Sequence, residues 1–483
     1  MILGIDQGTT GTRALLFDEQ GQVISSAYAE ITQHFPRPGW VEHDPEEIWE
    51  ATLGVSRQAL REAGVDGSAL AAIGITNQRE TAVAWDRASG RPLHRAIVWQ
   101  DRRTAARCDV LRADGVEPLV RERTGLVLDP YFSATKYEWL LREGGVGPDA
   151  CLGTIDAWLL FKLAGRHATD YSNASRTMLF NIRTLEWDEG LCELFGVPVE
   201  ALPEPVPTAG VLGETQALGG SVPVAALVGD QQAALYGQGC HSPGLAKNTF
   251  GTGSFLLSHA GSTPPPIEEG LIATVAWGID GRVDYALESS MFVTGAAVQW
   301  LRDGLGIIDE AAETEALAAS LESNDGIYFV PALAGLGSPY WDPYARGTIV
   351  GLTRGAGRAH LARATLESIA YQTVDAAVAQ NRALGAELRE LRADGGATAN
   401  GWLMQFQADV LGVPVLVSAI EETTALGAAY LAGVAVGAWS EEDVRAMWTA
   451  ARSYEPRMDS DRREALLEDW RRAVKRSRGW VRP

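Results

Sequence analysis

Residues 2–18 read ILGIDQGTTGTRALLFD, two apolar segments joined by a turn that is rich in glycine and threonine. These segments, and a further short one at residues 23–26, predict antiparallel strands joined by tight turns. Glycines allow positive φ angles and a close approach of the backbone to an anion, and successive N–H groups then form a nest for phosphate oxygens. Arg13 adds positive charge, and Asp6 is placed at a strand end to hold Mg²⁺ through water. An ordinary hairpin turn that requires glycines is the alternative.

A second segment repeats this pattern in the other half of the chain. Residues 245–258 read LAKNTFGTGSFLLS, again an apolar strand, a Gly-Thr-Gly turn and an apolar strand. We interpret it as a second phosphate-binding hairpin facing the first, although glycine-rich turns are common. Neither turn has the Gly-x4-Gly-Lys-Ser/Thr pattern, or the GxGxxG pattern that opens a helix, of the common nucleotide loops. The repeat predicts two domains, residues 1–238 and residues 239–483.

Strands and helices alternate in both halves, which is typical of an α/β architecture. A helix is expected from Pro45 to about Ala63, with Asp44 as its N-cap and Glu47 completing a capping box. Further helices are expected at 154–163, 231–237, 293–301, 362–380 and 461–476. Strands are expected at 71–76, with 81–86 as its hairpin partner, and at 96–100, 225–230 and 391–394. The last strand ends at Gly395-Gly396, before a helix whose free N–H groups suit a nucleotide phosphate or ribose.

Composition narrows the classes of protein to which the chain can belong. The 483 residues carry 41 basic and 62 acidic side chains, a net charge of −21, which disfavours nucleic acid as a partner. The cysteines (Cys108, Cys151, Cys192 and Cys240) form no CxxC pair, so reduced buried thiols are expected rather than a zinc site or a disulfide framework. No signal peptide or membrane-spanning run is recognisable, and we expect a cytoplasmic protein without membrane insertion.

Polar side chains at strand ends suggest a second binding function. Asn77-Gln78-Arg79-Glu80 follows a buried strand, and Arg79 and Glu80 could hydrogen-bond adjacent hydroxyls of a polyol, although a solvated turn is equally compatible. Trp99 and Phe255 could form apolar walls for its carbon atoms. Asp230 follows another buried strand and could accept the proton of an attacking hydroxyl, cap the next helix, or do both. Phosphoryl transfer needs such positioning groups, a metal and a base.

Ten motifs, in order along the whole chain, resemble those of the FGGY family of carbohydrate kinases, and within it the glycerol kinases. They are DQGTTGTR (6–13), GITNQRET (74–81), AIVWQDRRT (96–104), TGLVLDPYFSATK (124–136), DYSNASRTMLFNI (170–182), GDQQAAL (229–235), KNTFGTGSF (247–255), GLGSPYWDPYARGTIVG (335–351), DGGATAN (394–400) and TALGAAYLAG (424–433).

This resemblance implies two actin-like, ribonuclease-H-like domains that close over ATP and Mg²⁺, and transfer of the γ-phosphate of ATP to a terminal hydroxyl of glycerol. It implies that the general base is Asp230, a residue that could also face the metal, with Asp6 as the metal-side acid. It implies glycerol contacts from Arg79, Glu80, Trp99, Tyr131, Asp230, Gln231 and Phe255. It implies ATP contacts from Thr9, Thr10, Gly11 and Arg13 in the first domain and from Thr252, Gly295, Gln299, Gly396 and Asn400 in the second. Relatives form dimers and tetramers, so a homodimer or homotetramer is expected.

Two departures from the family pattern affect these expectations. Many relatives have Ser-Ser where this chain has Gly11-Thr12, so a hydroxyl contact at residue 11 is lost. Residues 214–224 (ETQALGGSVPV) contain neither arginine nor histidine. In some bacterial relatives this region binds fructose 1,6-bisphosphate, and in others it carries a phosphorylated histidine, so we expect neither regulation here.

Two other functions remain as alternatives. A kinase of the same family could act on a pentulose, gluconate or a longer polyol, but Arg79-Glu80 with Trp99 and Tyr131 favours glycerol. An actin-like ATP-binding module would need the phosphate hairpins without a polyol pocket, and the Asn77–Glu80 and Asp230-Gln231 motifs argue against it.

Overall fold

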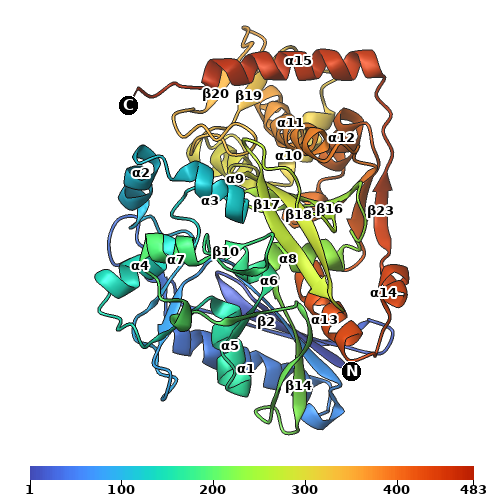
Figure 1. Cartoon of the computed structure of the whole chain (residues 1–483). Helices are drawn as coiled ribbons and strands as arrows, with labels where there is room; N and C mark the ends of the chain where they lie inside the picture. The colour runs from blue at the N-terminus through green and yellow to red at the C-terminus, as the bar shows by residue number, and fades with distance from the viewer. Residues whose placement is uncertain (483) are drawn as a thin grey trace.

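Two sheets with matching strand order form the framework of the protein, whose computed structural model describes residues 1–482 (Figure 1). The first sheet has the order β13 (Ala209–Thr215), β14 (Val222–Gly229), β5 (Ala72–Asn77), β1 (Ile2–Gln7), β2 (Gly11–Phe17) and β3 (Val23–Glu30). The second has the order β17 (Ile272–Ile279), β18 (Arg282–Met291), β16 (Ser254–Gly261), β15 (Leu245–Phe250), β21 (Glu390–Asp394), β22 (Val415–Ser418) and β23 (Ala450–Tyr454).

Pairing directions in the two sheets are the same. In the first, β1 is antiparallel to β2 and parallel to β5, and β5 is parallel to β14, which is antiparallel to β13. In the second, β15, β16, β21, β22 and β23 repeat these relations, with β16 in the place of β2. The repeat inferred from the two Gly-Thr turns is therefore confirmed as a repeat of structure.

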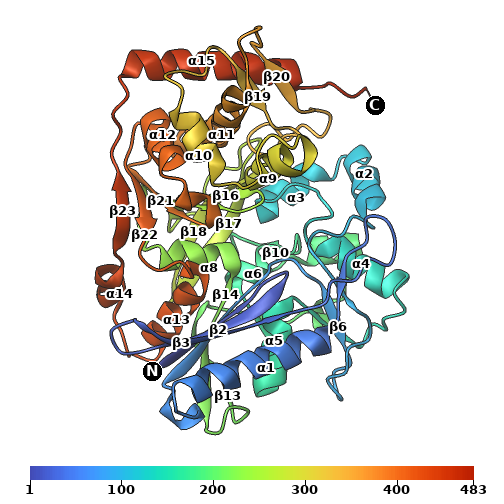
Figure 2. The ribbon, with the colours of Figure 1, turned by 180° about the vertical axis from the view of Figure 1, so that it is seen from behind.

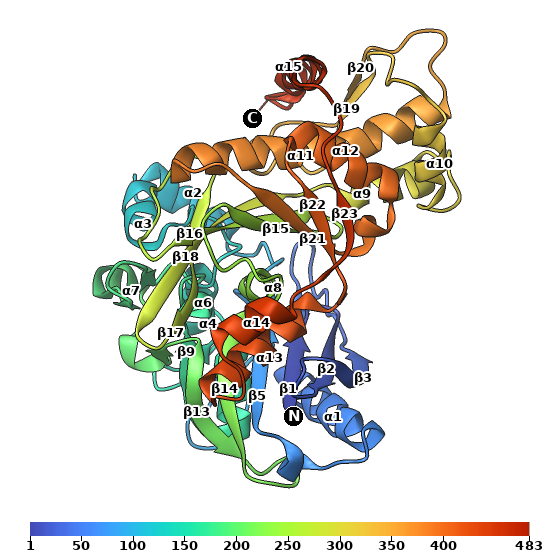
Figure 3. The same cartoon turned by 90° about the vertical axis from the view of Figure 1, so that its right-hand side faces the viewer.

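Helices cover both faces of each sheet, and Figure 3 shows the resulting layers. One outer layer, against the first sheet, contains α1 (Pro45–Glu62) and α5 (Ile155–Ala164). The other outer layer, against the second sheet, contains α11 (Arg358–Leu384) and α12 (Gly401–Leu411). Between the sheets lie α8 (Asp230–Gly237) and α13 (Thr423–Ala435), which share one buried core with strands from both sheets.

The two central helices touch through their backbones. A Cβ atom added at Gly427 of α13 would lie 1.9 Å from the carbonyl oxygen of Ala233, and one added at Gly237 of α8 would lie 2.1 Å from that of Thr423. Real carbon atoms do not approach an oxygen so closely, so both positions require glycine. The small residues of the GDQQAAL and TALGAAYLAG motifs therefore serve this close contact.

The remaining α-helices and the short strands lie around these layers, and Figure 2 shows the molecule from behind. The helices are α2 (Ala105–Ala113), α3 (Glu117–Thr124), α4 (Ala134–Arg142), α6 (Tyr171–Ala174), α7 (Glu189–Phe195), α9 (Gly295–Gln299), α10 (Glu313–Ala319), α14 (Glu441–Met447) and α15 (Ser460–Ser477). The short strands are β4 (Glu42–His43), β6 (Val83–Trp85), β7 (Ala96–Ile97), β8 (Cys151–Gly153), β9 (Ala168–Asp170), β10 (Phe180–Asn181), β11 (Glu186–Trp187), β12 (Glu204–Val206), β19 (Tyr328–Val330) and β20 (Thr348–Val350).

Two local predictions are wrong. The strand β6 is not the hairpin partner of β5, because it pairs with β8, while β5 is enclosed between β1 and β14. The capping box of α1 does not form either. Asp44 accepts a hydrogen bond from the backbone N–H of Glu46, as predicted for an N-cap, but the carboxylate of Glu47 accepts from the backbone N–H and the hydroxyl of Thr32 instead. Tertiary contacts outcompete the local pattern in both cases.

The four cysteines are buried and free, as expected. Within residues 1–482, no helix combines the length and the apolar character that a membrane span requires.

Candidate active site

The carboxyl ends of three parallel strands meet at one edge of the first sheet. The register aligns Gln7 of β1 with Asn77 of β5, and Asn77 with Gly229 of β14. The segments that follow these strands (residues 8–10, 78–80 and 230–231) therefore lie side by side. Ligands of open α/β sheets typically bind at such an edge.

Arg79 connects two of these segments. Its Nε lies 3.0 Å from Oδ1 of Asp230, and its Nη1 lies 2.6 Å from Oε2 of Glu288. Burial acts to lower the pKa of Arg79, but the charges of Glu288 and its other neighbours outweigh this and keep the guanidinium charged. Asp230 is partly exposed, and its Oδ1 also accepts the backbone N–H of Gln231 at 2.6 Å. Both contacts use Oδ1, so Oδ2 is available to a ligand.

Glu80 is held in an uncommon backbone conformation. Its φ angle is 61°, in the left-handed region that side chains other than glycine seldom adopt. The Nζ of buried Lys136 and the hydroxyl of Ser133 both donate to its carbonyl oxygen, at 3.0 and 3.1 Å. The Glu80 carboxylate accepts from Nε of Arg176 at 2.6 Å. Glu80 thus lies in the turn between β5, which ends at Asn77, and the following segment, in which Ala82 pairs with Ile97.

Aromatic side chains connect two parts of the candidate site. One part is the candidate polyol pocket around Arg79 and Glu80, and the other is the turn at residues 8–10 between β1 and β2, which we call the first phosphate turn after its predicted role. Trp99 donates from Nε1 to the hydroxyl of Thr9 at 2.8 Å, and its ring lies edge to face with that of Tyr131 at 5.6 Å. Lys136 also donates to the Tyr131 carbonyl oxygen at 2.5 Å, so one buried cation fixes both Glu80 and Tyr131. Burial raises the pKa of the Tyr131 phenol, which keeps it a neutral hydrogen-bonding group.

The first phosphate turn has a charged surrounding. Burial raises the pKa of Asp6 to about 7, assisted by the negative charges of Asp230 and Glu422 and opposed by Arg13. Arg13 lies 2.6 Å from Glu422, in the segment before α13. The turn itself is accessible at Thr10. A side chain at residue 11 would collide with the Ala29 carbonyl oxygen and the Tyr28 ring, so glycine fits here where relatives have serine.

The second half brings its predicted nucleotide residues together in one cavity of about 400 Å³. This cavity is lined by all five of them: Thr252, Gly295, Gln299, Gly396 and Asn400. Thr252 comes from the turn between β15 and β16, Gly295 opens α9, and Gly396 follows β21. Arg302 and Glu315 also line the cavity and were not predicted from the sequence. The mixture of backbone edges, apolar walls and a few polar groups suits a nucleoside.

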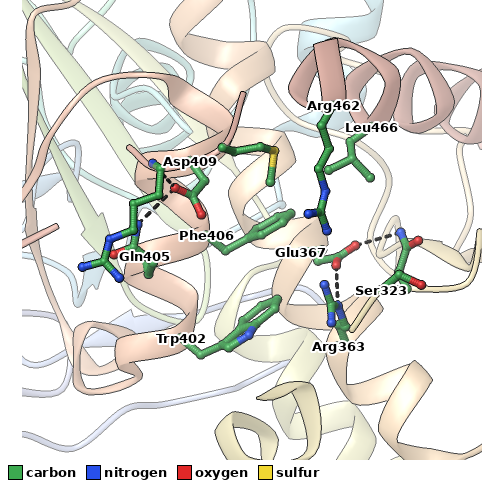
Figure 4. Close-up of a pocket in the computed structure, with 12 residues that line it drawn as sticks. Ser323, Arg363, Glu367, Trp402, Gln405, Phe406, Asp409, Arg462 and Leu466 are labelled. Carbon is green, nitrogen blue, oxygen red and sulfur yellow. Dashed lines mark hydrogen bonds and ion pairs between the residues drawn. The ribbon is translucent and has the colours of Figure 1, made fainter. Parts of the chain in front are cut away.

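A cavity of about 380 Å³ lies elsewhere, among α11, α12 and α15 (Figure 4). Its walls include none of the predicted site residues. It is therefore separate from the candidate active site.

Phe255 and Gln231 meet the second sheet. Phe255 lies on β16, two residues before Leu257, which is directly opposite Glu288 of β18. Because alternate residues of a strand share a face, Phe255 and Glu288 are on the same face of this sheet. Gln231 accepts a hydrogen bond from Nζ of Lys247 on β15, a buried lysine whose pKa burial lowers to about 8. The candidate polyol site is thus bordered by both halves of the chain.

Four buried charged residues of the site were not predicted, namely Lys136, Arg176, Lys247 and Glu288. Lys247 and Glu288 each stand inside an otherwise uncharged strand segment, LAKNTF and YALESSM. A charge within such a buried segment requires a buried partner. The isolated charge in each segment could therefore have indicated that Lys247 and Glu288 take part in a buried polar site. Lys136 and Arg176 lie inside quoted motifs, but their local pattern gives no sign of their partners.

Comparison with known proteins identifies the family and the fold. The model of the FGGY family of carbohydrate kinases matches residues 1–237 with its N-terminal domain and residues 246–436 with its C-terminal domain. The chain is 55% identical to a glycerol kinase of Halorhodospira halophila, over 100% of this chain and 97% of the relative. It is 53% identical to glycerol kinase 2 of Thermotoga maritima, over 99% of each chain. A crystal structure of Plasmodium falciparum glycerol kinase with ADP superimposes with a TM-score of 0.93 and 34% identity, covering 100% of this chain and 98% of that one.

Proposed function

The chain belongs to the FGGY family of carbohydrate kinases, and from this premise we propose that it is a glycerol kinase. It transfers the γ-phosphate of ATP to a terminal hydroxyl of glycerol and releases ADP and glycerol 3-phosphate. The observation that carries this function is the identity of more than half of all positions to glycerol kinases over the full chain. The pairing of Arg79 with Asp230 beside the first phosphate turn supports it.

We propose that Asp230 is the general base. Arg79 and the backbone N–H of Gln231 hold Oδ1, which leaves Oδ2 to accept the proton of the attacking hydroxyl. Arg79, Glu80 and Tyr131 would bind the hydroxyl groups of glycerol, with Gln231 beside the base, while Trp99 and Phe255 would cover its carbon atoms. Positioning of this kind supplies much of what phosphoryl transfer requires.

The first phosphate turn and the second-half cavity would hold ATP together. Thr9, Thr10, Gly11 and Arg13 would meet the phosphates. Thr252, Gly295, Gln299, Gly396 and Asn400 would bind the nucleoside end, and their shared cavity supports this assignment.

The carboxylates around the turn fit Mg²⁺. Two of them, Asp6 and Asp230, are close enough for the charge of one to raise the pKa of the other, a repulsion that a cation would relieve. Few protein ligands suit Mg²⁺, because it keeps several of its waters. Asp6 would hold the ion through water, with Asp230 as a second acid near it. When bound, Mg²⁺ neutralises charge on the phosphates.

The proposal also covers the domain boundary, the oligomeric state and the cellular location. We divide the enzyme at residues 238 and 239, which the residues matched by the two family domains support. We expect a homodimer or homotetramer. We place the enzyme in the cytoplasm, where ATP is available and where the four buried thiols would stay reduced.

A coupled kinase assay over a panel of polyols, gluconate and ketoses tests the function. Glycerol should give the highest kcat/KM, with ATP as phosphate donor and Mg²⁺ required. Preference for a five-carbon ketose would contradict the proposal.

The same assay tests regulation. Residues 216–221 form the short connection between β13 and β14 and contain no arginine or histidine. We therefore predict that fructose 1,6-bisphosphate leaves the rate unchanged, and clear inhibition would contradict this.

A further inference from the structure

Glu288 belongs to the second sheet, but its charged partners belong to the first half of the chain. It lies on β18, and its side chain has no solvent exposure. Its Oε2 lies 2.6 Å from Nη1 of Arg79, and its Oε1 lies 3.0 Å from Nη2 of Arg176. Each oxygen thus pairs with a different arginine.

The register of the second sheet explains how a residue so far along the chain reaches Arg79. Lys247 of β15 is directly opposite Leu257 of β16, which in turn is directly opposite Glu288 of β18. Leu257 packs in the core that contains α8, so this row of three residues points towards the first half. Lys247 contacts Gln231 at one end of the row, and Glu288 contacts the two arginines at the other.

Glu288 connects the groups that border the candidate polyol pocket. Arg79 reaches from Glu288 to Asp230, and Arg176 reaches from Glu288 to Glu80. Without Glu288, two buried guanidinium groups would face each other with one neutralising charge fewer. The Arg79 guanidinium, which is held between carboxylates of the two halves, would also lose the charged partner of its Nη1 and keep only the neutral one, Gln232.

The β17–β18 hairpin is firmly joined to the first half around this point. The hydroxyl groups of Ser175 and Thr274 lie 2.8 Å apart, and Gln232 donates to Thr274 at 3.1 Å. Gln232 also accepts from Nη1 of Arg79 at 3.2 Å. The position of Glu288 relative to Arg79 is therefore set by several contacts besides the ion pair.

We propose that Glu288 is a positioning residue for the polyol site, acting through Arg79 and Arg176 rather than by touching glycerol. The inference rests on the proposed glycerol kinase function. Under this proposal, both halves of the chain form the polyol pocket. Glu288 of the C-terminal half orients Arg79 of the N-terminal half, and Arg79 binds the polyol.

Replacement of Glu288 by glutamine tests this role with little change of shape. The amide oxygen of glutamine still accepts a hydrogen bond from one of the two arginines. The NH₂ group cannot accept one, so the other arginine loses its hydrogen bond as well as its charged partner. We expect the glycerol KM to rise roughly 10- to 100-fold, the loss typical of a charge-assisted hydrogen bond. The KM for ATP should stay within about twofold of wild type, since the nucleotide cavity is lined by other residues.

Glu367→Gln is the matched control, because it changes a similarly buried glutamate that lines the separate cavity among α11, α12 and α15. Glu367 is 2% exposed on α11, and its oxygens accept from Arg363 at 2.8 Å and from Asn324 at 2.9 Å (Figure 4). This variant should unfold at a lower temperature than wild type but keep both KM values. Glu288→Asp, which keeps the charge on a shorter side chain, should give a glycerol KM between those of wild type and Glu288→Gln.

The outcomes separate this inference from the proposed function. A wild-type enzyme that fails to phosphorylate glycerol overturns the function, and the inference with it. An active wild type with an unchanged glycerol KM in Glu288→Gln overturns only the inference. A parallel rise of both KM values, or an equal rise in Glu367→Gln, would reduce Glu288 to a structural role and also overturn it. If Glu288→Gln does not fold, an unchanged glycerol KM in Glu288→Asp decides against the inference, and a selective rise supports it.

Discussion

In the first half of the molecule the chain leaves β5 into Gln78-Arg79-Glu80, whose side chains are buried and partly charged. In the second half it leaves the equivalent strand, β21, into Gly395-Gly396, which have no side chains and are exposed. One scaffold thus presents side chains at its first edge and backbone at its second. A polyol with several hydroxyls needs directional side-chain partners, whereas a nucleotide can be held by N–H groups and apolar walls.

Two carboxylates make the same contrast. Asp6 of β1 is partly exposed beside the first phosphate turn, and its pKa is raised first by burial and then by the negative charges of Asp230 and Glu422. Asp394 of β21, which pairs with Thr249 in the equivalent row, accepts hydrogen bonds from Gln238 at 2.8 Å and Thr423 at 2.7 Å. The first is available to a metal, and the second joins structural elements.

The strongest test of the contrast removes the proposed general base, Asp230, from the first sheet's binding edge. Asp230→Asn should lower turnover by roughly 10²- to 10⁴-fold, because the amide cannot accept the proton of the hydroxyl. Glycerol binding, measured by calorimetry, should persist. Turnover close to that of wild type with glycerol bound would show that another group is the base.

The next test removes Arg79, the side chain that contacts both Asp230 and Glu288 at the first sheet's binding edge. Arg79→Ala should raise the glycerol KM by roughly 10- to 100-fold, since Asp230 and Glu288 lose a charged partner, and should leave the KM for ATP nearly unchanged. Arg79→Lys should lie between, because a single ammonium cannot reproduce the geometry of the guanidinium. Steady-state kinetics with each substrate varied in turn would show whether this selectivity holds.

The converse test adds a side chain at Gly395, where the second sheet presents only backbone. A Cβ atom added at Gly395, where φ is 88°, would lie 2.4 Å from the carbonyl oxygen of Phe250, a residue that lines the proposed nucleotide cavity. Gly395→Ala should therefore raise the KM for ATP by roughly tenfold and spare the glycerol KM. Gly437→Ala is the matched control, since φ is 70° there but nothing lies within 4 Å of the added atom. Equal effects of the two variants would refute the steric explanation.

The smallest expected effect concerns stability rather than catalysis. Burial raises the pKa of Asp375 on α11 from 3.8 to about 6, against hydrogen bonds from Trp470 and Tyr340 that both reach Oδ2. Such a group stabilises the fold fully below about pH 4, and this contribution is lost as the pH rises through 6. Asp375→Asn should therefore gain stability relative to wild type as the pH rises from 4 to 7, by about 1 to 3 kcal/mol.

Denaturant unfolding at several pH values would measure this gain, with kcat/KM expected to stay within about twofold of wild type. Asp156 is the comparable acid of the first half, with a pKa also raised by burial to about 6. Both of its oxygens accept hydrogen bonds from threonine hydroxyls, so Asp156→Asn should be less stable than wild type at pH 4, and the same raised pKa predicts that this deficit shrinks as the pH rises. If both variants behaved alike, the hydrogen-bond geometry would not be what distinguishes them.

Much of the fold could be predicted because its signals are local. The segment at residues 2–18 is a hairpin, Asp230 follows a buried strand, and the two Gly-Thr turns mark the repeat. Four of the five predicted second-half residues follow a strand or begin a helix at the same end of the second sheet, and Gln299 reaches the cavity from the last position of the short helix α9. Their contacts with ATP and glycerol remain predictions.

The partners of buried charges could not be predicted, since they depend on distant segments. Glu288 meets Arg79 from 209 positions along the chain, and no local pattern encodes that contact. The place of β6 beside β8 also depends on tertiary structure, because β1 and β14 occupy both sides of β5 and leave no pairing position for β6. Sequence patterns specify the elements, and packing decides which of them meet.

The backbone contact between α8 and α13 has a consequence for how such a chain can diverge. At Gly237 and Gly427 each helix occupies the space that a new side chain on the other would need. A point mutation at either glycine meets main chain, which no change of rotamer can move aside. A substitution at either glycine is therefore unfavourable as long as the other helix keeps its position. Surface residues of both halves can change during evolution without affecting this pair of glycines.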